Sequence, residues 1–74
     1  MTVDAQTWLL RYSEILGVDP PSKTEIEALL ALAGVAAHAS ERTAAPVSCW
    51  VAARAEKSAD EALVAAEALA STLE

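Results

Sequence analysis

The chain has 74 residues and a formal net charge of −6, and 18 of its residues are alanine. A chain of this length forms one small domain, and its alanine content predicts a thin core with closely packed helices. The acidic balance excludes a general nucleic-acid binder, which needs a basic surface to displace counterions, and it disfavours adhesion to an anionic membrane.

Cysteine usage and the absence of long apolar runs favour a cytoplasmic protein. The single cysteine cannot form an internal disulfide, which fits a reducing compartment. The opening MTVDAQ carries an acid and no basic residue, so we expect no secretory signal peptide. The longest apolar run, residues 28–37, is too short to span a bilayer.

The first helix is predicted at about residues 4–16. Asp4 is suited to its N-cap and Gly17 to the position just past its end. The segment GVDPPS (17–22) then stops the helix, because proline cannot continue it. Apolar side chains recur at steps of three and four residues and form one stripe, namely Trp8, Leu9, Tyr12, Ile15 and Leu16.

The second helix is predicted at about residues 23–42. Ser22 and Glu25 have the spacing of a capping box, in which each side chain accepts a hydrogen bond from the other residue's amide. The expected core stripe of this helix consists of Ile26, Leu29, Leu30, Ala33, Ala36 and Ala37.

The third and fourth helices are predicted at about residues 46–57 and 59–73. Pro46 suits a first helical turn, and Ser58 with Glu61 forms a second capping box. We expect Trp50 to anchor the core, the alternative being an exposed anchor for a partner. With no strand pattern and only short connections, the sequence predicts an all-α protein, a small four-helix bundle. The core stripe of the last helix consists of Ala59, Ala62, Leu63, Ala66, Leu69, Ala70 and Leu73.

The segment HASERTAAPVSCW (38–50) differs from the rest of the chain in its chemistry. It holds the only histidine and the only cysteine, and it opens the one locally basic stretch, residues 42–57. His38 and Arg42 are four residues apart, so we expect them on one helix face beside the free amides of the third helix. Such a corner could hold an anion or a partner's carboxylate, with the candidate binding residues His38, Arg42, Thr43 and Pro46.

Structural explanations for the same residues stay open. His38 could pack beside the third helix or cap a carbonyl, and Arg42 could simply complement a helix dipole. Cys49 lies near a helix N-terminus, which lowers a thiol pKa, but a small structural cysteine is the expected role. We predict no metal site, because a zinc site takes about four ligands and few residues here could supply them. No catalytic motif is visible, so we predict no catalytic residues and no cofactor.

The stretch VAAHASERTAAPVSCWVAA (35–53) resembles a family of small uncharacterised helical domains from actinobacteria. The resemblance lies in His38, Arg42 and the following Thr-Ala-Ala-Pro of residues 43–46, and WLLRYSEILGV (8–18) is similar to the opening of that family. Such domains occur alone or fused to proteins like the molybdenum cofactor guanylyltransferase. The resemblance implies an accessory role in molybdopterin cofactor assembly and supplies no catalytic residues.

The favoured function is therefore a non-catalytic accessory or interaction module that assists molybdopterin cofactor assembly. One alternative is a small anionic-ligand-binding protein or enzyme that uses the corner of His38 and Arg42. The other is an oligomerisation domain, since alanine-rich faces let helices approach closely. The expected partners are a second copy of the chain or another protein, such as a molybdenum cofactor assembly enzyme, rather than nucleic acid or membrane.

Overall fold

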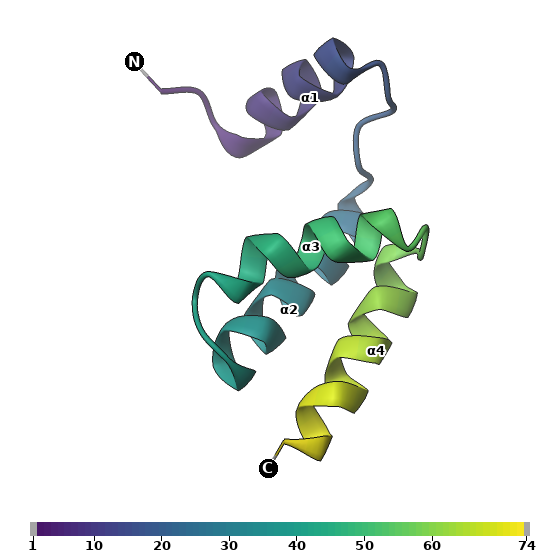
Figure 1. Ribbon diagram of the computed structural model, residues 1–74. Coiled ribbons are helices and arrows are strands. Elements are labelled where there is room, and N and C mark those ends of the chain that lie inside the picture. Colours follow the sequence, from purple (N-terminus) through teal and green to yellow (C-terminus); the bar gives the residue numbers. More distant parts are fainter. Residues whose placement is uncertain (1, 74) are drawn as a thin grey trace.

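A computed structural model describes residues 2–73, which form four helices and no strand (Figure 1). They are α1 (Ala5–Leu16), α2 (Lys23–Ala39), α3 (Ala44–Arg54) and α4 (Ala59–Thr72). The predicted all-α class, with four helices and short connections, is confirmed.

Three of the predicted helix starts are confirmed by their caps. The Asp4 carboxylate accepts a hydrogen bond from the Thr7 amide at 2.7 Å. Ser22 and Ser58 open α2 and α4 with complete capping boxes. In each box the serine hydroxyl accepts a hydrogen bond from the glutamate amide, and the glutamate carboxylate accepts one from the serine amide. These bonds satisfy amides that the first helical turn leaves free.

Glycine ends α1 as predicted. Gly17 has a φ of 72°, in the left-handed region that glycine enters at least cost. Its amide donates to the Glu14 carbonyl, and the Val18 amide donates to the Ser13 carbonyl at 3.0 Å. This pair of bonds is a Schellman motif, which turns the chain out of the helix and into the segment that carries Pro20 and Pro21.

The second helix is shorter than the sequence predicts. It ends at Ala39 rather than near Arg42, and Ser40 has already left the helical conformation. The Ser40 backbone, with a φ of −134° and a ψ of −108°, turns the chain out of the helix before Arg42. Instead α3 begins at Ala44, two residues earlier than predicted, and takes Pro46 into its first turn.

The third helix also ends early, at Arg54 rather than near Lys57. Its C-cap is Ala55, and the next residue, Glu56, has a φ of 58°. A left-handed residue stops a right-handed helix, and for a residue with a Cβ this conformation is costly. The connection to α4 therefore carries local backbone strain.

The core is small and centred on α2, which packs against both α3 and α4. The buried apolar residues are Ala28, Leu32 and Ala62. Four predicted core positions are wrong, since Leu30, Trp50, Leu69 and Leu73 are 61% to 69% exposed. Leu30 lies two residues from Leu32, which places it on the opposite side of α2.

The first helix lies outside the unit formed by α2, α3 and α4 (Figure 1). Its inner side faces the following segment and the start of α2, where Leu9 and Leu10 share a shallow hollow with Pro20, Pro21 and Ile26. Ser13 on this helix is buried, and its hydroxyl donates to the Leu9 carbonyl at 2.7 Å.

The molecule exposes more surface than a compact domain of its size. Its accessible surface is 6056 Å² for a mass of 7.7 kDa, whereas about 4,300 Å² is expected for a compact monomer. The radius of gyration is 13.2 Å, against about 11 Å for a compact chain of this length. The position of α1 accounts for this extension, and it leaves a large apolar area without a partner inside the chain.

Candidate functional site

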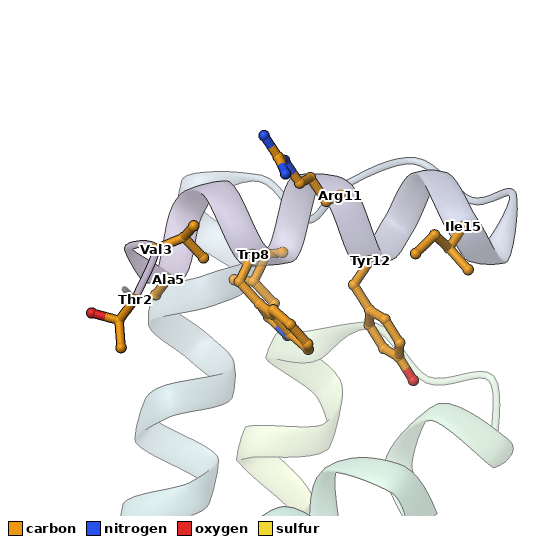
Figure 2. Close-up of a pocket in the computed structure, with 8 residues that line it drawn as sticks. Thr2, Val3, Ala5, Trp8, Arg11, Tyr12 and Ile15 are labelled. Atoms are coloured by element: carbon orange, nitrogen blue, oxygen red, sulfur yellow. The ribbon is translucent and has the colours of Figure 1, made fainter.

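One side of α1 carries three large side chains that the fold does not bury. Trp8 is 58% exposed, Tyr12 is 49% exposed and Ile15 is 80% exposed. They are spaced at i, i+4 and i+7, which places them on one side of the helix. Figure 2 shows Trp8 and Tyr12 projecting from the same side of α1, while Arg11 leaves the helix in a different direction. We call these three residues the α1 face.

The outer side of α3 carries a second set of the same kind. Val47, Trp50 and Val51 are 56% to 66% exposed and recur at i, i+3 and i+4. We call these three residues the α3 face. Arg54 continues the same side by one turn and lies in the last turn of the helix, where its charge complements the helix dipole.

The charged groups at the ends of the two faces differ in sign, although the cation Arg11 also lines the hollow beside the α1 face. Asp4 caps the N-terminus of α1. Hydrogen bonds from Thr7 hold the pKa of Asp4 below its ordinary value, and the backbone amide contributes more than the side chain. It is therefore a carboxylate at neutral pH. The α3 face ends in the cation Arg54 and is followed by Lys57. A large apolar face edged by one charge is what a protein docking surface offers a partner of the opposite charge.

The predicted corner is present, but its residues do not share a helix face. His38 is exposed in the last turn of α2 and lines a shallow hollow with Ala70 and Leu73 of α4. Arg42 is exposed and lies beyond the end of α2, in the turn of residues 40–43. The spacing of four residues that was expected to align the two side chains therefore does not apply, because the helix ends between them.

The amides expected to bind an anion at this corner are mostly engaged. The Ala44 amide donates to the Glu41 carbonyl at 2.9 Å, and the Ala45 amide donates to the Arg42 carbonyl at 3.2 Å. Pro46 has no amide hydrogen. Thr43 occupies the N-cap position of α3 without a side-chain capping bond. The corner thus presents exposed side chains at Arg42, Thr43 and Pro46 rather than a cradle of free amides.

Cys49 is a free thiol that is partly buried. It lines a shallow hollow with Ser13, Leu29 and Ala62, where the end of α1 comes near the other three helices. Within residues 2–73, no group of three or more histidine, cysteine, aspartate and glutamate side chains is placed to hold a metal ion. None of the helices in the described part of the chain combines the length and apolar composition needed to cross a membrane.

Sequence reasoning recognised the stripe on α1 and the group of residues on α3, but it placed Trp50 in the core. The spacing of apolar residues on a helix is the same for a stripe that packs inside a domain and for one that docks on another molecule. Only the arrangement of the helices separates the two cases, and it leaves Trp8 and Trp50 exposed.

Comparisons with known proteins identify a family and no characterised relative. A family model described as a domain of unknown function (DUF6457) matches residues 2–74, which is nearly the whole chain. No curated protein and no solved structure gives a significant match.

Proposed function

The chain belongs to the DUF6457 family, and we propose that it is a non-catalytic helical interaction module that docks through its α1 and α3 faces. The observation that carries this proposal is the exposure of two tryptophans and four other large apolar side chains on two helix faces. Exposed apolar patches of this size in a small protein mark interaction surfaces. Tryptophan and tyrosine are also the residues that most often supply binding energy at interfaces.

We propose a molybdenum cofactor assembly enzyme, such as the guanylyltransferase, as the partner. The support is the resemblance of residues 35–53 to domains fused to such proteins. This segment contains the α3 face together with Arg42, so the resemblance and the exposed surface coincide at one place in the fold. In this role the chain positions or stabilises the enzyme and carries out no chemistry itself.

The test is a titration of the full chain onto immobilised molybdenum cofactor guanylyltransferase. Val51→Asp places a charge in the centre of the α3 face, and we expect it to weaken binding by about a hundredfold, since a charge buried at an interface without a partner is costly. Val51 is exposed, so the variant should keep its helical structure as measured by circular dichroism.

Val64→Asp is the matched control. Val64 is 64% exposed and Val51 is 56% exposed, but Val64 lies on α4, which carries neither face. It should bind as the wild type does. No binding by the wild-type chain, or equal losses in the two variants, would contradict the proposed function.

A further inference from the structure

The α1 face and the side of α3 that carries the α3 face and Arg54 match each other in length. The α1 face runs from Trp8 to Ile15, and the α3 face together with Arg54 runs from Val47 to Arg54. Each spans two helical turns, or about 10 Å. The α3 face can therefore cover Trp8 and Tyr12 when the two helices lie side by side, while Ile15 reaches beyond Val47.

An antiparallel pairing also matches their charges. With Trp8 opposite Trp50, Tyr12 meets Val47 and Ile15 reaches the start of α3. Asp4 at the start of α1 then lies opposite Arg54 at the end of α3, and a carboxylate meets a guanidinium. At the other end Arg42 approaches the C-terminus of α1, where a cation is favoured by the helix dipole.

This pairing does not occur within one chain. Leu9 and Leu10 on the inner side of α1 face Pro20, Pro21 and the start of α2, and Ser13 is buried. The α1 face lies on another side of the helix, where Figure 2 shows Trp8 and Tyr12 projecting toward the other helices, but its three side chains stay 49% to 80% exposed. The packed helix pairs are α2 with α3 and α2 with α4, so the α3 face of the same chain leaves the α1 face open to another molecule.

The area is sufficient for a stable pair when the contact is made twice. In a two-fold arrangement each chain contributes both its α1 face and its α3 face. Covering them removes about 800 Å² from each chain, which is the share of one partner in a standard specific interface. It also accounts for much of the surface by which the 6056 Å² of this chain exceeds that of a compact monomer.

We infer that in the free protein the two faces are occupied by a second copy of this chain, with each α1 packed antiparallel on the α3 of the other chain. The inference rests on the proposed function, because it names the occupant of the same two faces. An assembly enzyme would then compete with the second copy for them.

The test uses two charge reversals and sedimentation velocity over a wide dilution range. Asp4→Lys places two cations together at each contact of its own dimer, and Arg54→Glu places two anions together. Each variant alone should dissociate at about tenfold higher concentration than the wild type. An equimolar mixture restores both opposite-charge contacts, so it should form heterodimers with close to wild-type affinity.

A second pair of variants covers the case in which Asp4→Lys weakens α1 by removing its cap. Ile15→Ser truncates the α1 face and leaves the cap intact, and it should weaken dimers by about tenfold. Val64→Ser, on α4, should leave the dimer unchanged. A wild-type chain that is monomeric at every concentration, or equal effects of the two serine variants, would overturn the inference.

The two proposals can fail separately. Binding of the wild-type chain to immobilised guanylyltransferase is measured in an assay that does not depend on whether the chain self-associates. A monomeric chain that still binds the enzyme, with loss on Val51→Asp, would remove the second copy and leave the interaction module in place.

Discussion

Trp8 and Tyr12 stack on each other along one side of α1, with ring centroids 5.9 Å apart and ring planes inclined by 17°. They are one helical turn apart, so the contact restricts both side chains while leaving both rings exposed. Side chains that are already ordered lose less entropy when they bind, which favours docking on a partner. The pair lies outside the core, and in the proposed function it is a preformed part of the binding surface.

Leu30 and Leu32 separate the core of α2 from its exposed side. Leu32 is 3% exposed and Leu30 is 69% exposed. Leu32→Ala should lower the free energy of unfolding by about 3 kcal/mol, because it leaves a cavity among α2, α3 and α4. Leu30→Ala should change it by less than about 0.5 kcal/mol. Urea denaturation measures both, and equal losses would contradict the packing described for α2.

The capping box of α4 predicts a pH dependence. The pKa of Glu61 is held below its ordinary value of 4.5. The largest cause is the hydrogen bond from the Ser58 backbone, followed by the one from the Ser58 side chain and by the positive charge of Lys57. A lowered carboxyl pKa stabilises the folded state above that ordinary value, and the effect is lost as the pH falls through the folded-state pKa.

We therefore expect thermal stability to fall as the pH is lowered from 4.5, the ordinary pKa of Glu61. Glu61→Gln keeps an acceptor oxygen for the Ser58 amide and removes the titration. Thermal melts of the variant should show a smaller loss over the same pH range. A variant as sensitive to acid as the wild type would show that Glu61 contributes little.

The left-handed residue before α4 predicts a stabilising substitution. Glu56 has a φ of 58°. Glycine adopts this conformation without the steric cost paid by a residue with a Cβ, so Glu56→Gly should raise the free energy of unfolding by about 1 kcal/mol. Ala55→Gly is the control, because Ala55 has a φ of −80° and gains nothing from glycine. Chemical denaturation should show stabilisation for the first variant and destabilisation for the second, and the reverse order would contradict the turn geometry.

Local features of this fold could be predicted from the sequence, and the packing could not. The capping boxes of Ser22 with Glu25 and Ser58 with Glu61 join residues that are three apart. Their hydrogen bonds depend only on this local spacing, so the sequence is enough to predict them. The choice between Leu30 and Leu32 depends on which helices flank α2. Apolar residues occur on several sides of that helix, and their pattern alone does not say where α3 and α4 will lie.

The candidate site was predicted in the same incomplete way. The segment 38–50 was singled out for its chemistry, and it does contain part of an exposed face, at Val47 and Trp50. The alignment of His38 with Arg42 depended on a helix that continues past Ala39, and the chain leaves the helix at Ser40. The role of the α1 face follows from the position of α1 outside the other three helices, which no spacing of residues reveals.

Arg42 tests whether the corner takes part in docking. It is exposed and outside both helices, so Arg42→Glu should change the free energy of unfolding by less than about 0.5 kcal/mol. Beside the C-terminus of a docked α1 the new carboxylate is repelled by the helix dipole, so dimer dissociation should occur at higher concentration. Sedimentation velocity and thermal melts measure the two effects. Unchanged association would place Arg42 outside the interface.

Accessibility of the Trp8 ring in a chain whose only tryptophan is Trp8 tests docking of the α1 face most directly. The variant Trp50→Phe keeps an aromatic ring on the α3 face and leaves Trp8 as the only indole. Acrylamide quenching of its fluorescence, measured over a dilution series, reports how much of Trp8 is covered. Docking of the α1 face on a second copy predicts weak quenching at high concentration and strong quenching once the dimers dissociate. Quenching that is the same at every concentration would contradict it, whether Trp8 is always shielded within its own chain or always exposed.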